Sequence, residues 1–80
     1  METRIKDIRI DRDLTQEEVA KAIGITQRKY SYLETGVQDW NGELLVKLAE
    51  FYHTSVDYLL KVTDDPRPYP RKKHYRRRKP

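Results

Sequence analysis

The stretch LTQEEVAKAIGITQRKYSYLETG, residues 14–36, contains two short helical patterns joined by a glycine. Thr15 and Glu18 have the spacing of a capping box, in which a hydroxyl and a carboxylate each accept a backbone N–H at a helix start. Gly24 follows the first pattern, where a residue that tolerates positive φ is favoured. Thr26 is placed to cap a second helix, which ends at the last glycine of the stretch. These signals predict a helical hairpin with a tight turn.

The apolar residues of both patterns fall on one side of their helices. Val19, Ala20 and Ile23 form the stripe of the first helix, and Tyr30 and Leu33 form that of the second. Helices this short are unstable alone, because about 12–15 residues are needed for even marginal stability in water. Both stripes must therefore pack against other elements.

Helical patterns also flank the hairpin, and no segment alternates as a strand does. We expect a helix over residues 3–12, another over residues 41–52, and a short final helix that Ser55 caps. The prolines from Pro66 onward forbid further helix. The sequence therefore predicts an all-α domain of five helices over residues 1–63, followed by a basic tail over residues 64–80 that we expect to be disordered.

The net charge of +4 comes entirely from the tail. Residues 1–65 hold nine Lys/Arg and thirteen Asp/Glu, a net charge of −4, whereas residues 66–80 hold eight Lys/Arg and no acid. Such a tail has the composition of a solubilising end, of an arm along a DNA backbone, or of an RNA-stacking segment that uses Tyr69 and Tyr75. We favour the DNA arm. The high pI therefore says nothing about what residues 1–65, the body of the protein, bind.

Several classes of protein have no support in the sequence. There is no cysteine, no glycine-rich phosphate loop after a strand, and no companion for His53 or His74 in metal or nucleophile chemistry. We therefore expect no enzymatic activity, no catalytic residue, no metal and no cofactor. The chain has no apolar run as long as a membrane span and no apolar signal segment at its start, so we expect a cytoplasmic protein.

The second helix of the hairpin, residues 26–35, has a polar face suited to a DNA groove. Gln27, Ser31 and Thr35 lie at spacings of four, with Arg28 and Tyr32 beside them, and this face carries no acid. The major groove is about 12 Å wide, and a helix with its side chains is about 10–12 Å across. Polar side chains at the start of such a helix can reach base edges. The alternative reading is an ordinary solvated helix face.

These residues resemble the helix-turn-helix signature of the Cro and phage-repressor family, also called the xenobiotic-response-element-like (XRE) family. The resemblance covers about residues 3–61 and includes IKDIRIDRDLTQ, LLVKLAEFY and SVDYLL. It implies a compact, lambda-repressor-like five-helix domain that regulates transcription. It also implies binding to double-stranded DNA, with a homodimer on a palindromic operator.

The resemblance assigns roles to individual residues. Gln16 and Gln38 would contact the DNA backbone, and Gln27 and Arg28 would contact base edges. Together, the implied DNA contacts are Gln16, Thr26, Gln27, Arg28, Lys29, Ser31, Tyr32 and Gln38. The resemblance also implies a partly buried ion pair between Arg9 and Glu34, which would turn the only acid of the second hairpin helix inward.

Three residues depart from the family pattern. Trp40 stands where proline is usual, and we expect it to cover an edge of the core. Gly42 stands where an apolar residue is common. His53 stands where glycine is usual after the fourth helix, so a left-handed conformation there would be costly. Two other functions stay open: a protein-interaction or antitoxin-like module on the same fold, and an RNA-binding protein that uses its tail.

Overall fold

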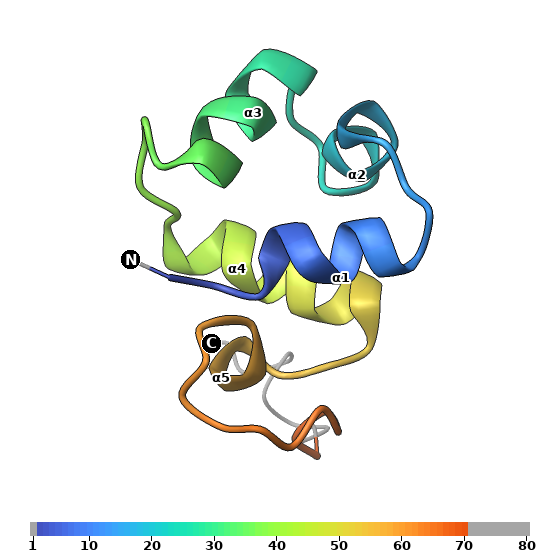
Figure 1. The fold of residues 1–80 in the computed structure, drawn as a ribbon, viewed down its shortest axis with the longest axis vertical. Coiled ribbons are helices and arrows are strands. Elements are labelled where there is room, and N and C mark those ends of the chain that lie inside the picture. The colour runs from blue at the N-terminus through green and yellow to red at the C-terminus, as the bar shows by residue number, and fades with distance from the viewer. Residues whose placement is uncertain (1, 71–80) are drawn as a thin grey trace, which may run out of the picture.

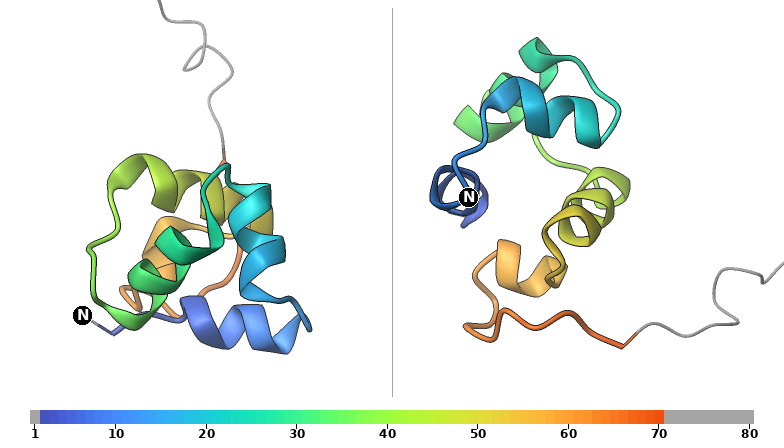
Figure 2. Two further views of the ribbon diagram at one scale, coloured as in Figure 1. Left: turned by 90° about the horizontal axis from the view of Figure 1, so that it is seen from above. Right: turned by 90° about the vertical axis from the view of Figure 1, so that its right-hand side faces the viewer.

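The computed structural model describes residues 2–70, and within this range the chain forms helices and no strand. In chain order these are α1 (Ile5–Asp11), α2 (Gln16–Ala22), α3 (Gln27–Thr35), α4 (Gly42–Tyr52) and α5 (Val56–Leu59) (Figure 1). α1 and α4 cross the middle of the molecule, with α2 and α3 on one side and α5 on the other (Figure 2). This arrangement confirms the predicted all-α, five-helix class. The predicted tail continues into residues 71–80, which lie outside the described residues.

Side-chain caps fix where four of the helices begin. The Thr15 hydroxyl accepts the Glu18 N–H at 3.0 Å, and the Glu18 carboxylate accepts the Thr15 N–H at 2.8 Å, which is the predicted capping box. Thr26, Asn41 and Ser55 each accept a backbone N–H from the residue three positions later. Each such cap stabilises a helix by about 0.5–2 kcal/mol.

α1 is shorter than the predicted helix over residues 3–12. The Arg4 N–H donates to the Leu59 carbonyl at 2.8 Å, which ties the start of α1 to the end of α5. At the other end, the Arg12 guanidinium donates to the Tyr52 carbonyl at 3.1 Å. Residues that a helical pattern alone would include therefore serve contacts between elements.

The core lies between the helices and draws on all five of them. All five stripe residues predicted from the hairpin are buried in it, and α1, α4 and α5 supply the rest. Its members are Ile5, Val19, Ala20, Ile23, Tyr30, Leu33, Leu44, Leu45, Leu48, Ala49, Tyr52 and Leu59. Burying one large apolar side chain contributes about 1.5–3 kcal/mol, so this cluster is the main source of stability.

Trp40 and His53 take the places that the sequence predicts for them. The Trp40 ring packs edge-on against Tyr30, with 5.9 Å between ring centroids, and covers an edge of the core. His53 ends α4 in the left-handed region, with φ 57°. That conformation costs a non-glycine residue about 1–2 kcal/mol.

None of the helices in the described part of the chain has both the length and the apolar content needed to cross a bilayer.

Candidate nucleic-acid interface

α3 lies at one end of the long axis of the molecule and packs on α2 (Figure 1). Tyr30 and Leu33 are buried on its inner side. Thr26 caps the helix, and Gly36 ends it in the left-handed region with φ 89°. The inner stripe therefore fixes which side of α3 faces outward.

The first turn of α3 presents polar and basic side chains to solvent. Gln27, Arg28 and Lys29 are exposed, and this turn contains no acid. Tyr32 is exposed and Ser31 half-buried further along the helix. Among residues 2–70, nothing pairs with the side chains of Gln27 and Arg28, so their donors and acceptors are available to a partner.

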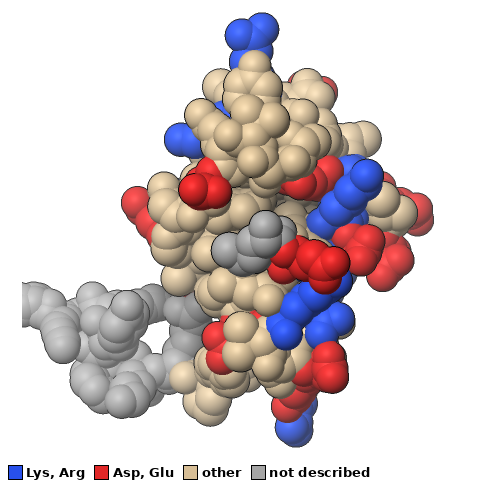
Figure 3. Space-filling model, turned by 60° about the vertical axis from the view of Figure 1, so that its left-hand side comes forward, with Lys and Arg blue, Asp and Glu red and all other residues tan. Residues whose placement is uncertain are grey.

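The space-filling view shows the same distribution of charge. At the end of the molecule formed by α3, the surface is mostly uncharged, with isolated Lys or Arg groups (Figure 3). Asp and Glu side chains gather further along the molecule, away from that end (Figure 3). On the face that this view shows, the end formed by α3 therefore carries little negative charge.

Glu34, the only acid of α3, accepts hydrogen bonds from three side chains. The Arg9 guanidinium donates to both carboxylate oxygens, at 2.9 and 3.0 Å, and so forms the ion pair implied by the family resemblance. The Tyr30 hydroxyl donates at 2.6 Å and the Gln16 amide at 3.0 Å. We call Arg9, Gln16, Tyr30 and Glu34 the Glu34 network.

The Glu34 network keeps its carboxylate charged although the side chain is only 3% exposed. Burial on its own would raise the pKa of Glu34, but hydrogen bonds from Arg9, Tyr30 and Gln16 outweigh it and hold the pKa below its usual value. Burial, together with the hydrogen bond to Glu34, raises the pKa of Tyr30. At neutral pH, the charged Glu34 carboxylate of α3 therefore pairs with Arg9 of α1 and faces away from the outer surface of α3.

Gln16 has a structural contact that the sequence did not reveal. It is half-buried at the start of α2, and its amide donates to Glu34. A glutamine amide carries a second N–H and a carbonyl, so it can still bind a further group. The first turn of α2 also holds Glu17 and Glu18, and these carboxylates already complement the positive end of the helix dipole. A phosphate contact here would depend on the Gln16 side chain.

Gln38 lies on the exposed loop between α3 and α4. Its backbone N–H donates to the Tyr32 carbonyl at 3.0 Å. That amide is therefore occupied within the protein, and the implied phosphate contact would depend on the Gln38 side chain.

Tyr30 was identified in the sequence only as a core residue. Its hydroxyl nevertheless donates to Glu34, four residues later on the same helix. The signal was available, because residues four apart on a helix are neighbours. Within the described residues there is no group of three or more His, Asp or Glu side chains that could hold a metal ion.

Comparison with known proteins agrees with this geometry. The sequence model of the Helix-turn-helix family matches residues 5–59. The cryptic phage CTXphi transcriptional repressor RstR of Vibrio cholerae is 41% identical over 58 residues, which are 72% of this chain and 52% of that protein. The HTH-type transcriptional regulator YobD of Bacillus subtilis is 40% identical over 65 residues, 81% of this chain and 58% of that protein.

A third relative is matched over most of its own length. It is an HTH-type transcriptional regulator of Archaeoglobus fulgidus, 33% identical over 57 residues, which are 71% of this chain and 80% of that protein. The chain spans a little more than half the length of the two relatives from Vibrio and Bacillus. No solved structure gives a significant match. The family match and these relatives, together with the α2–turn–α3 hairpin, show that the chain belongs to the helix-turn-helix family of the XRE type.

Proposed function

We propose that this protein is a transcriptional regulator that binds double-stranded DNA in a sequence-specific manner, with α3 in the major groove. One observation carries the proposal. The first turn of α3 exposes unpaired polar and basic side chains, whereas its only acid is held inward by Arg9. Acids outnumber bases in residues 1–65, so an exposed helix face without a function would be expected to carry some of them.

Gln27 and Arg28 are the residues to which we assign base recognition. An arginine can donate two hydrogen bonds to a guanine edge, and a glutamine can pair with an adenine edge. Ser31 and Tyr32 follow on the same face of α3. The Tyr32 ring, 40% exposed, offers apolar surface to a thymine methyl group.

Four further residues are assigned to the phosphate backbone: Gln16, Thr26, Lys29 and Gln38. Contacts of this kind fix the register of a protein on the duplex but carry no sequence information. The cations of the tail add affinity for phosphate that does not depend on sequence. We also propose a cytoplasmic homodimer on a palindromic operator, since paired half-sites about 34–36 Å apart suit two such helices. No residue is assigned a catalytic role.

Selection from a random pool of duplexes, followed by a substitution at Arg28, tests the proposal. Arg28→Ala should lose about 1–3 kcal/mol of binding free energy on the selected site and much less on random duplex. Lys61→Asn is the matched control. It also removes one cation, but at the α5 end of the body, and asparagine tolerates the left-handed φ of 65° at this position.

Equal losses for Arg28→Ala on selected and random duplexes would rule out base recognition by this residue. If neither the full chain nor residues 1–70 enriches any duplex, the protein is not a sequence-specific DNA binder. In that case, a protein-interaction module or an RNA-binding protein becomes the better account.

A further inference from the structure

The loop between α3 and α4 carries one of the assigned DNA contacts without any cation of its own. Residues 36–41 contain no Lys or Arg, and Asp39, next to Gln38, is an exposed acid. Charge attraction from the loop itself therefore cannot hold a phosphate there. A contact has to come from hydrogen bonds that the Gln38 amide donates, and such bonds weaken steeply when their distance or angle departs from the optimum. The contact thus depends on how firmly the loop is held.

Hydrogen bonds fix the two ends of the α3–α4 loop. Near its start, the Gln38 N–H donates to the Tyr32 carbonyl of α3 at 3.0 Å. At its end, the Asn41 side chain accepts the Leu44 N–H at 2.8 Å and so caps α4. Between these points the loop runs along the outside of the molecule from α3 to α4 (Figure 1). Its middle has to be held by side-chain packing.

Trp40 is the loop residue that packs against the core. Its ring meets the Tyr30 ring edge-on, with 5.9 Å between ring centroids and 77° between ring planes. The other apolar residue of the loop, Val37, is 69% exposed. Edge-to-face aromatic pairs are favourable beyond the area that they bury, and they prefer a defined geometry. Trp40 therefore holds the loop at a defined place on α3.

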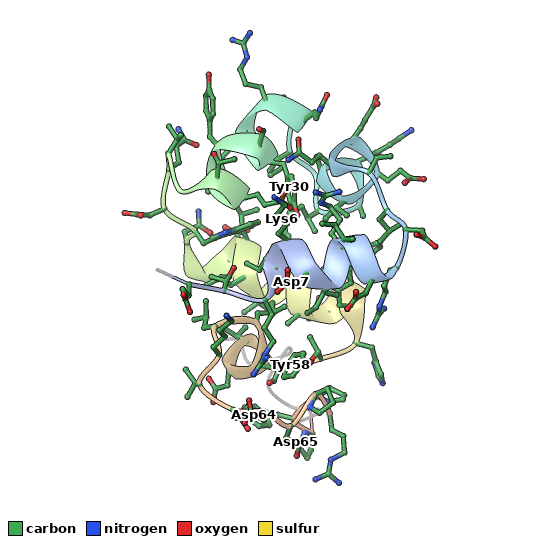
Figure 4. The ribbon with its side chains drawn as sticks, in the orientation of Figure 1. Lys6, Asp7, Tyr30, Tyr58, Asp64 and Asp65 are labelled. Atoms are coloured by element: carbon green, nitrogen blue, oxygen red, sulfur yellow. The ribbon has the colours of Figure 1, made fainter. Side chains whose placement is uncertain are left out.

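Tyr30 is a fixed support for this contact. Its side chain is fully buried and lies between α3 and the helices in the middle of the molecule (Figure 4). Its hydroxyl donates to the Glu34 carboxylate at 2.6 Å. Tyr30 also belongs to the helix that carries Gln27 and Arg28. The Trp40 ring thus ties the loop to the helix to which we assign base recognition.

We propose that Trp40 is a positioning residue for DNA binding, which holds the α3–α4 loop on Tyr30 so that the Gln38 amide meets one phosphate of the duplex bound by α3. The inference rests on the proposed function, which supplies the duplex and the role of Gln38. Trp40 acts through Gln38 and makes no DNA contact itself. A residue that only covered the core would change stability, but it would leave the Gln38 contact intact in every folded molecule.

Single methylphosphonate substitutions in the selected duplex test the inference on the full-length protein. Each substitution replaces one charged phosphate oxygen by a neutral methyl group and so removes the acceptor of one contact. The Gln38 phosphate is the one whose substitution weakens binding of the native protein, by about tenfold, but no longer weakens binding of Gln38→Ala.

Variants of Trp40 should change the response at this phosphate alone. Trp40→Ala should lose the sensitivity there and keep both the sensitivity at the other phosphates and the preference for the selected site. Trp40→Phe keeps a ring edge for Tyr30 and should retain the sensitivity. The double variant Gln38→Ala/Trp40→Ala should bind the unmodified duplex within about twofold of Gln38→Ala, because both changes act on one contact.

Phe51→Ala is the matched control. Phe51 lies at the other end of α4, is 41% exposed, and packs against the buried Tyr52 with 5.0 Å between ring centroids. Its removal costs a similar aromatic contact but should leave the response to every phosphate as in the native protein. Far-UV circular dichroism under the binding conditions shows whether each variant is folded. If Trp40→Ala is unfolded, Trp40→Leu replaces it with the same expected result, since leucine covers the core but offers Tyr30 no ring edge.

Four results would overturn the inference. The Trp40 variant could keep the native sensitivity at the Gln38 phosphate, which would make Trp40 a residue of stability alone. It could instead lose sensitivity at every phosphate, or Phe51→Ala could lose it at the Gln38 phosphate, and either result would assign the effect to the whole domain. Gln38→Ala could abolish the effect of no phosphate, which would leave Trp40 no contact to position. If no site is selected at all, the proposed function fails instead, and the two failures are distinct.

Discussion

Replacing Arg9 by methionine removes the only cation of the Glu34 network and keeps a side chain of similar length. The Arg9 and Glu34 side chains are 13% and 3% exposed. Removing one partner of a buried ion pair costs about 3–5 kcal/mol, because the other charge stays buried without compensation. Hydrogen bonds from Tyr30 and Gln16 to the carboxylate remain in the variant. We therefore expect the free energy of unfolding to fall by about 3 kcal/mol, the lower end of that range.

The loss should depend on pH, because Glu34 titrates differently in the two proteins. In the native protein the pKa of Glu34 is held below its usual value of 4.5, despite burial. When a carboxyl group has a lower pKa in the folded state than in the unfolded state, it stabilises the fold at pH values above its unfolded-state pKa. This stability is lost as the pH falls through the folded-state pKa. In Arg9→Met, burial is less opposed and the pKa rises, so protonation at low pH favours the folded variant. The difference in stability should therefore shrink from pH 7 to pH 3.

Urea unfolding followed by far-UV circular dichroism at both pH values measures this difference. Lys47→Met is the matched control, because Lys47 pairs with Glu43 at 3.9 Å on the surface of α4, with 49% and 79% of the two side chains exposed. An exposed pair contributes about 0–1 kcal/mol, so the control should barely change. Breaking a buried ion pair is expected to cost several kcal/mol. If Arg9→Met lowered the free energy of unfolding at pH 7 by less than about 1 kcal/mol, Glu34 would not be both buried and charged. A loss that stays constant with pH would contradict the same assignment.

Three further changes should alter stability in directions that the structure specifies. The Tyr52 hydroxyl is buried without a hydrogen-bond partner among the described residues, so Tyr52→Phe should raise the free energy of unfolding by about 1 kcal/mol. Burial raises the pKa of Tyr52 to about 12, so the native protein should also lose stability above pH 10, and the variant should lose less. Gly42→Ala, in the first turn of α4 with open space around it, should stabilise by about 0.4–1 kcal/mol, whereas Gly36→Ala should destabilise by about 1–2 kcal/mol because of its positive φ. Urea midpoints measure all three variants, and a lower midpoint for Tyr52→Phe, or shifts of the same sign for the two glycines, would contradict these assignments.

Local chemistry explains why much of the fold was predictable. The Thr15–Glu18 capping box depends on residues three apart, so the sequence alone reveals it. The stripe from Val19 to Leu33 follows helical periodicity and is buried as predicted. The positive φ of His53 at the end of α4 was implied by the family resemblance, because glycine is usual at this position.

The contacts that could not be predicted join residues far apart in the chain. Gln16 and Glu34 are separated by 18 positions, and Arg4 and Asp64 by 60. Each pair forms only because of how whole helices pack together. Helical periodicity in a single sequence does not show which residues of two helices will meet. The shorter length of α1 could not be predicted for the same reason, because Arg4 and Arg12 at its two ends form hydrogen bonds with α5 and α4. Contacts of the same kind hold residues 63–69 against the α5 end of the domain.

The Glu34 network limits how binding experiments on this domain can be interpreted. Gln16→Ala would remove the assigned phosphate contact, but it would also remove one of the hydrogen bonds that compensate the buried Glu34 charge. A loss of affinity in that variant therefore combines a lost contact with a lost constraint on α3, and its effect cannot be assigned without the free energy of unfolding. Arg28 has no partner within residues 2–70, so removing its side chain leaves the packing of α3 intact. The affinity that Arg28→Ala loses on the selected site beyond its loss on random duplex therefore measures base recognition, which makes Arg28 the position at which base recognition by α3 can be accepted or rejected.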